Sequence, residues 1–211
     1  SNSSTLHYRV KLENDSGGIV PRGNLYYYIP VPKQGAALPS GMGNEPPAFG
    51  FSLTGAVSVS GSNPTIYELR YSTNATADNY DNGAPSFDSS DGKAVWLTAE
   101  EIYQNKLWAD VTMVKLIVKE SVSAIPRDTV DYFTLKLQCT ETDEGISQKA
   151  GSSLIWRSAG RQIAQDGQKY TATPSEDTSA MIRFEDARDI TMTASAQDQD
   201  QGAITVSSDS A

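Results

Sequence analysis

The fold of this 211-residue chain is decided by the stretch Leu25-Tyr26-Tyr27-Tyr28-Ile29-Pro30-Val31-Pro32-Lys33, which follows the alternating run Leu6-His7-Tyr8-Arg9-Val10-Lys11-Leu12-Glu13-Asn14 after a polar turn. In the earlier run apolar and polar residues alternate, which is the pattern of a strand with one buried face. The later stretch is rich in β-forming residues until Pro30 and Pro32. Because proline has no backbone N–H to donate, the second predicted strand must leave its sheet there.

Further strand-like runs follow along the chain, separated by clusters of turn-forming residues. The predicted strands span 6–13, 24–31, 49–59, 65–72, 111–120, 129–140, 153–158, 167–173, 179–185 and 189–195. The runs 111–118 and 131–139 flank a loop with Pro126 at its centre, so we expect these two runs to pair as antiparallel neighbours. The sequence therefore predicts an all-β fold, an antiparallel β-sandwich of immunoglobulin-like or jelly-roll-like type with one short helix.

The short helix is predicted over 98–105. Thr98 and Glu101 have the spacing of a capping box, in which the Thr98 hydroxyl accepts from the Glu101 amide and the Glu101 carboxylate reaches back to the Thr98 N–H. Leu97 and Ile102 are placed to form the accompanying hydrophobic staple. We expect this helix to close one end of the sandwich.

Composition argues against two classes of partner. The formal net charge is -9, and no run of basic residues is present to bind nucleic acid or an anionic membrane. No apolar stretch is long enough to insert into a bilayer. The single cysteine, Cys139, excludes an intramolecular disulfide, and it shares the apolar face of its predicted strand, so we interpret it as a buried residue.

Catalytic sites find little support in the sequence. His7 is the only histidine and lies on the polar face of the first predicted strand, which argues against Ser-His-Asp, Cys-His and zinc sites. Carboxylates are plentiful, and a glycosidase needs only one suitably spaced pair of them, so an enzyme with such a pair remains a third, weaker alternative.

Calcium is the one cofactor that the sequence raises. Two loops, 78–83 and 88–92, combine hard oxygen ligands with turn glycines. The EF-hand spacing fails, because aligning Gly83 with the loop glycine places Tyr80 at a ligand position and Ser89 at the position of the bidentate glutamate. Asx turns explain the same residues without metal, so we expect no cofactor. If calcium did bind, the first ligands would be Asp78, Asp81, Asp88 and Asp91.

Aromatic residues are the candidate ligand-binding residues. Exposed rings can stack on sugars, as in non-catalytic carbohydrate-binding modules. In a strand, Tyr26 and Tyr28 share one face while Tyr27 points to the other, so the three cannot all be exposed together. The candidates for such a platform are Tyr27, Trp96, Trp108 and Trp156.

In their order along the chain, these pieces resemble a domain family of large, wall-anchored surface proteins of Gram-positive bacteria. The pieces are the 25–33 stretch, followed by 49–59, 71–80, 96–108 and 111–139. The resemblance spans roughly residues 6–195. It implies an extracellular β-sandwich module at the cell wall, and it implies no particular ligand.

Surface proteins of this class often carry a Lys-Asn isopeptide crosslink, which can be tested against the residues. The chain has no asparagine after Asn105, and Lys115 is the lysine that best fits a core-facing position. We therefore expect no crosslink, and we expect Lys115 to snorkel at a strand edge.

The sequence thus favours a non-catalytic extracellular adhesive or spacer module of a bacterial surface protein. The alternative is a carbohydrate-binding module of a secreted glycoside hydrolase. Expected partners are a host or neighbouring-cell protein or glycan and other domains of the same chain. Residues 1–5 are expected to be a disordered start or a cloning remnant, residues 6–195 a single β-sandwich domain, and residues 196–211 a last strand or a linker.

Overall fold

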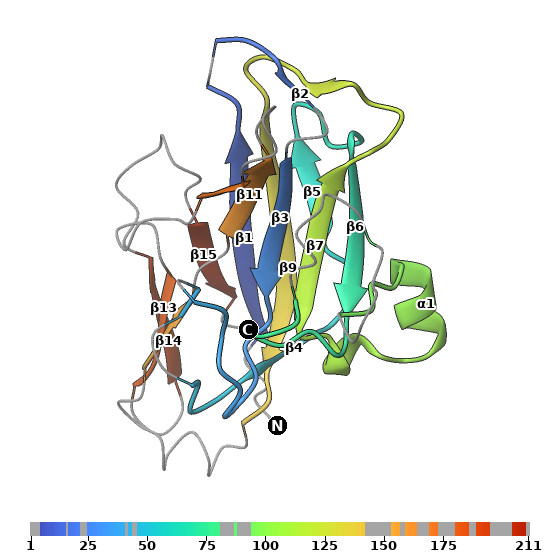
Figure 1. Ribbon diagram of the computed structural model, residues 1–211. Coiled ribbons are helices and arrows are strands. Elements are labelled where there is room, and N and C mark those ends of the chain that lie inside the picture. Colours follow the sequence, from blue (N-terminus) through green and yellow to red (C-terminus); the bar gives the residue numbers. More distant parts are fainter. Residues whose placement is uncertain are drawn as a thin grey trace.

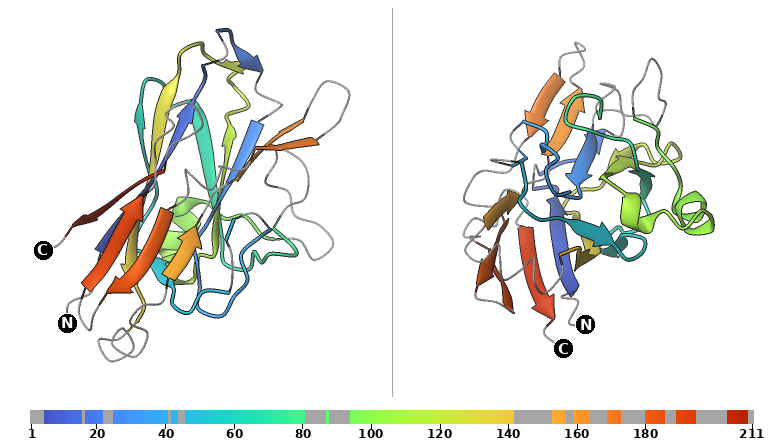
Figure 2. Two further views of the ribbon diagram at one scale, coloured as in Figure 1. Left: turned by 90° about the vertical axis from the view of Figure 1, so that its left-hand side faces the viewer. Right: turned by 90° about the horizontal axis from the view of Figure 1, so that it is seen from below.

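The computed structural model describes residues 5–15, 17–21, 25–40, 42–43, 46–80, 87, 94–141, 153–156, 159–163, 169–172, 180–185, 189–194 and 204–209. For Val20, Pro21, Leu25 and the strands beyond residue 141, the description covers the backbone only. Strands dominate these residues and form two five-stranded sheets that lie against each other, as the left view of Figure 2 shows from the side.

The first sheet contains the N-terminal strand. Its hydrogen-bonded order is β15-β1-β9-β4, and β5 pairs with β9 on the same edge as β4. Its strands are β1 (Thr5–Glu13), β4 (Phe51–Leu53), β5 (Ser58–Gly61), β9 (Val130–Cys139) and β15 (Ile204–Asp209). In the register between the two terminal strands, Thr5 lies opposite Asp209 and Val10 opposite Ile204. Residues 204–209 are therefore a strand of this sheet.

The second sheet has the order β12-β11-β3-β7-β6, with β6 at one edge (Figure 1). Its strands are β3 (Leu25–Pro30), β6 (Tyr67–Ser72), β7 (Met113–Val118), β11 (Ala159–Ile163) and β12 (Lys169–Ala172). Two smaller sheets complete the fold: a three-stranded one of β10 (Ser153–Trp156), β13 (Ala180–Glu185) and β14 (Asp189–Ala194), and a pair of β2 (Val20–Pro21) with β8 (Ala124–Ile125).

Every assigned strand pair is antiparallel, so the predicted all-β antiparallel fold is confirmed. The predicted exit of the second strand is also confirmed, because β3 ends at Pro30. Tertiary pairing added strands that local patterns did not indicate, namely β2, β8 and β11, and it divided the predicted strand 49–59 into β4 and β5.

The predicted pairing of 111–118 with 131–139 is wrong. Strand β7 lies between β3 and β6, whereas β9 lies between β1 and β4, so the two strands belong to different sheets. The connection between them contains β8, whose Ile125 lies opposite Val20 of β2. This connection therefore crosses from one layer to the other. Strand β7 is buried along its whole length, as expected for a strand that has a neighbouring strand on each side and packed side chains on both faces.

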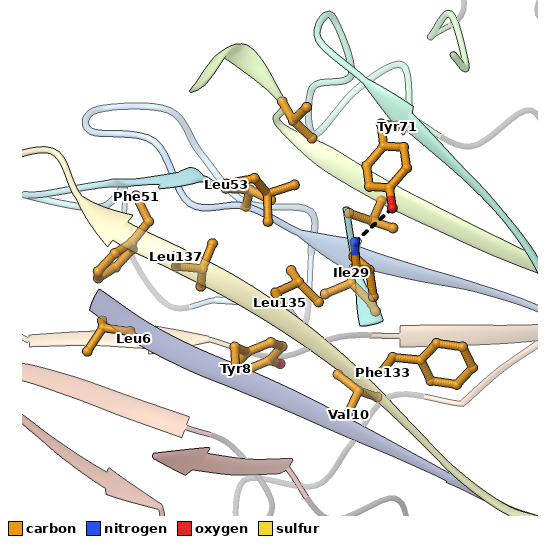
Figure 3. Packing of buried hydrophobic residues seen from close by; sticks show 14 of the residues in the cluster. Leu6, Tyr8, Val10, Ile29, Phe51, Leu53, Tyr71, Phe133, Leu135 and Leu137 are labelled. Carbon is orange, nitrogen blue, oxygen red and sulfur yellow. Dashed lines mark hydrogen bonds between the residues drawn. The ribbon is translucent and has the colours of Figure 1, made fainter. Parts of the chain in front are cut away.

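The core lies between the two five-stranded sheets (Figure 3). The first sheet contributes the alternate residues that the sequence predicted to be buried, Leu6, Tyr8, Val10, Phe133, Leu135, Leu137 and Cys139. Leu12, the last residue of the same alternation in β1, is half-buried and packs against this cluster. On the opposite face of β1, Arg9 is exposed while His7 and Lys11 are half-buried.

The short helix α1 (Ala99–Gln104) lies beside the end of β6 (Figure 1). Both hydrogen bonds of the predicted capping box are present, and Ile102 is fully buried in the core. Just before the helix, Leu97 and Tyr71 exchange two backbone hydrogen bonds of 2.8 Å. After it, the 3-10 turn η2 (Trp108–Asp110) leads into β7.

The predicted position of Lys115 is wrong. This lysine lies at the middle of the central strand β7, not at a strand edge, and its exposed fraction is 0%. It points away from the core, toward a second cluster that covers the other face of the second sheet. We call this the outer cluster; it consists of Tyr26, Tyr28, Met42, Ala75, Ala94, Trp96, Met113 and Ile117.

Four aromatic rings surround the ammonium group of Lys115. The Nζ atom lies 5.2 Å from the ring centroid of Tyr28 and 5.5 Å from that of Trp96, and the rings of Tyr26 and Phe87 follow at 5.6 and 5.9 Å. Cation–π attraction of this kind strengthens when the charge is removed from water. The segment that carries Trp96 covers the sheet here, so the lysine cannot reach solvent.

A buried polar cluster connects β9 with the turn before β6. The Asp131 carboxylate, with an exposed fraction of 0%, accepts hydrogen bonds from the Tyr67 hydroxyl and from the Asn63 backbone N–H at 2.8 Å. Burial and the hydrogen bond to Asp131 raise the pKa of Tyr67 far above its usual range. Burial also raises the pKa of Tyr71, whose hydroxyl accepts from Val57 N–H across the core at 2.9 Å (Figure 3).

These two tyrosines predict a loss of stability at alkaline pH. A tyrosine in the unfolded chain ionises near pH 10, whereas Tyr67 and Tyr71 keep their protons in the folded state above that pH. The folded state then binds more protons, so the free energy of unfolding falls as pH rises above about 10. Because a tyrosine in the unfolded chain is only partly ionised just above pH 10, the slope is about 1 kcal/mol per pH unit for each ring. Urea unfolding at pH 8 to 11 measures this slope, and Tyr67→Phe should reduce it; an equal slope in both proteins would contradict the assignment.

Candidate functional site

The predicted calcium ligands are only partly described. Asp78 is exposed and lies in a turn, while Asp81, Asp88 and Asp91 lie outside the described residues. Among the residues that the structure describes, no group of three or more His, Cys, Asp or Glu side chains could hold a metal ion. The expectation of a loop without metal stays a prediction, with these four residues as the first ligands if calcium did bind.

The four predicted ligand-binding aromatics lie in different parts of the fold. Trp96 has an exposed fraction of 8% and belongs to the outer cluster. Tyr27 and Trp108 pack against the core on the other side of the sheet, and the Trp108 ring meets that of Tyr71 edge-on at 5.0 Å. Trp156 lies in β10, and its side chain is outside the description. The described members of this set therefore do not form one exposed stacking surface.

A concave site lies at the end of the second sheet. Strands β3 and β6 end here and β7 begins here, so the two segments that follow β3 and β6 face each other across the start of β7. Between them is a cavity of about 420 Å³, which we call the end cleft. Its lining residues are Pro30, Val31, Lys33, Ala36, Ala37, Leu38, Pro39, Thr73, Asn74, Ala75, Thr76, Ala77, Asp78, Thr112 and Met113.

One wall of the end cleft is held by side chains that bind nearby backbone. The Ser72 hydroxyl accepts from Ala75 N–H at 3.0 Å, and the Asn79 side chain accepts from Thr76 N–H at 2.7 Å. The Asn74 side chain accepts from Val95 N–H at 2.9 Å, which ties this wall to the segment before Trp96. Asx and serine turns therefore order residues 72–80.

The floor of the end cleft joins both walls. The Thr112 hydroxyl donates to the Ala75 carbonyl at 2.8 Å, and the Thr112 carbonyl accepts from Val31 N–H at 2.8 Å. Thr112 N–H also donates to the Ser72 carbonyl at 2.8 Å. One residue at the start of β7 thus fixes the distance between the segments that leave β3 and β6.

Lys33 anchors the other wall. Its Nζ donates to the Phe51 carbonyl at 2.7 Å and to the Ala109 carbonyl at 2.8 Å, which connects the chain after β3 to β4 and to η2. The same wall packs closely on Gly50, where a Cβ would lie 2.8 Å from the Gln34 nitrogen. Both contacts restrict the wall to one position.

Burial lowers the pKa of Lys33 to about 8, and the nearby Asp110 carboxylate partly opposes this effect. At neutral pH the amine is still mostly protonated, so it keeps donating to both carbonyls. With its charge held by two carbonyl groups, Lys33 acts as a structural anchor of the cleft wall.

The chemistry of the end cleft is mainly apolar. Its inner surface is built from small aliphatic groups, among them four alanines, and no aromatic ring lines it among the residues that the structure describes. Polar groups sit beside them on Thr73, Thr76 and Asp78. Such a cavity can enclose one or two aliphatic side chains of a ligand and bind its polar groups at the rim. The described part of its lining lacks the rings that stack on sugars.

Sequence patterns did not identify this site. The exit of the chain at Pro30 and the cluster of turn residues after Ser72 were both visible, but they are far apart in the sequence. Only the pairing of β3 and β6 with β7 brings them together.

Comparison of the chain with family models, with curated proteins and with solved structures found no match. Among the residues that the structure describes, no helix is both long and apolar enough to span a membrane.

Proposed function

We propose that this chain is a non-catalytic adhesive module of a bacterial surface protein, displayed outside the cell, which recognises a protein ligand through the end cleft. The observation that carries this proposal is the cleft itself: an apolar cavity of about 420 Å³ whose two walls and floor are ordered by hydrogen bonds in the free protein. A preformed cavity of this kind avoids the entropic cost of ordering loops on binding.

The lining favours a protein ligand over a sugar. Aliphatic surface such as that of Ala37, Ala75 and Leu38 suits an aliphatic side chain, whereas sugar rings are bound by aromatic faces. The position at the end of a rigid sandwich supports recognition as well, because loops on a stable scaffold are the usual place for binding residues. The resemblance to wall-anchored surface modules supports the extracellular setting.

A peptide-display experiment tests this proposal. A random peptide library is selected against the protein, and the affinities of the selected peptides are then measured for two variants. Ala37→Trp places a large side chain at the exposed mouth of the end cleft, and Ala56→Trp places the same side chain at an exposed position between β4 and β5. We expect the selected peptides to contain aliphatic anchor residues. Their affinity should fall roughly tenfold or more for Ala37→Trp and should not change for Ala56→Trp, because only the first variant removes about 1.4 kcal/mol of contact energy in the cleft.

Two results would contradict the proposal. Equal affinities for both variants would place peptide binding elsewhere on the molecule. A glycan array on which the wild type binds a neutral glycan and Ala37→Trp does not would instead support the carbohydrate-binding module.

A further inference from the structure

Among the side chains that the structure describes, those on the outer face of the first sheet are mainly basic, whereas the whole chain is acidic. Arg9 of β1 and Lys136 of β9 are both exposed, and their side chains point away from the core because residues 8, 10, 135 and 137 point into it. In the register of β1 with β9, Arg9 lies opposite Thr134 and His7 opposite Lys136. Arg9 and Lys136 are therefore diagonal neighbours on one face, a placement in which Cα atoms typically lie about 7 Å apart.

Few acids balance these cations. In strands β1, β4, β5 and β9, the described side chains on this face include one carboxylate, that of Glu13, and it forms a 2.7 Å ion pair with Lys11. Among the described residues, neither Arg9 nor Lys136 takes part in a salt bridge. The guanidinium of Arg9 lies 4.6 Å from the ring centroid of Tyr132, which holds it against the sheet. A face with two exposed cations on a chain of net charge -9 favours an anionic partner.

Hydroxyl groups surround the two cations. Thr134 lies between Arg9 of β1 and Ser58 of β5, and Ser60 lies opposite Tyr132. Ser58 and Ser60 are exposed. Cross-strand partners point to the same face of a sheet, so these hydroxyls and the cations share one face.

We infer that this face, formed by Arg9, Lys136, Thr134, Ser58 and Ser60, binds a sparsely charged acidic polysaccharide, such as a polymer of uronic acids. Its hydroxyls match the hydroxyls of sugars, and its two cations match occasional carboxylates. A protein partner would need an apolar anchor, and among its described side chains this face offers only a tyrosine ring that an arginine already covers. Nucleic acid carries one charge per roughly 1.7 Å, a density that two exposed cations cannot neutralise.

This inference does not depend on the proposed function, because the surface lies on the opposite sheet from the end cleft. Its test uses hyaluronan, which has one carboxylate per disaccharide, with neutral dextran, polyglutamate and duplex DNA as comparison polymers at low and physiological salt. The double variant Arg9→Ser/Lys136→Ser removes both cations. The matched control Lys106→Asn/Arg127→Ser removes the same charge from exposed positions elsewhere.

We expect the wild type and the control to bind hyaluronan, and the Arg9→Ser/Lys136→Ser variant to bind it at least tenfold more weakly. Added salt should reduce binding of the wild type more than binding of this variant. An equal loss in both double variants would show a general charge effect and overturn the inference. Absence of hyaluronan binding by the wild type would overturn it, as would tighter binding of polyglutamate or DNA. The Ala37→Trp variant should bind hyaluronan normally, which separates this surface from the end cleft.

Discussion

Phe133→Ala should lower the free energy of unfolding by about 3–5 kcal/mol. Phe133 is fully buried between the two sheets, and its ring meets that of Tyr67 edge-on with centroids 4.9 Å apart. Removing the ring leaves a cavity that the strands on either side cannot fill without breaking their own ladders. Denaturant unfolding gives the change directly, and the melting temperature should fall by roughly 6–20 °C for a chain of this size.

Phe133→Leu is the matched control for this prediction. It keeps most of the apolar volume and removes only the ring contact, so it should cost less than half as much as alanine. A loss below about 1 kcal/mol for Phe133→Ala would contradict the packing described here, because surface substitutions have effects of that order or less.

The second large effect is expected at Lys115. Lys115→Ala should lower the free energy of unfolding by about 2–4 kcal/mol, because it removes a fully buried side chain of four methylenes together with its cation–π contacts. An exposed lysine is the control: Lys136→Ala should change stability by no more than about 0.5 kcal/mol. Denaturant unfolding of both variants gives the comparison.

Lys115→Met separates volume from charge at this position. Methionine fills most of the same space but carries no charge, so the desolvation cost of the ammonium disappears together with its attraction to the rings. We expect a loss smaller than that of Lys115→Ala. If both variants are equally destabilised, the charge on Lys115 rather than its volume holds the outer cluster to the sheet.

Local signals in the sequence were sufficient for the strands with clear alternation and for the helix cap. Alternation over 6–13 and 131–139 requires only that each strand bury one face, and the spacing of Thr98 and Glu101 is a purely local geometry. Such features do not depend on which strand lies next to which. They were therefore predicted correctly before the layers of the sandwich were known.

Pairing and sites depend on contacts between distant segments. Lys115 has the same local pattern whether its strand is central or at an edge, and only β3 on one side and β6 on the other make it central. The end cleft likewise requires segments from 30–39 and 73–78 to meet. The basic residues at 7, 9 and 11 were visible in the sequence, but the register with β9 was needed to place Lys136 beside them.

The register of β1 with β15 determines how the domain responds to tension. Because Thr5 lies opposite Asp209, a pulling force applied at these two residues acts across the hydrogen bonds of the ladder and loads one pair at a time. The hydrogen-bonded pairs then break one after another from that end. If the two strands were pulled from opposite ends, all of the pairs would share the force. Separation of β1 would also remove one neighbour of β9. Strands β4 and β5 both pair with the other edge of β9. A domain connected in this way is poorly suited to carry load along a tether, and it is well suited to project sideways from one.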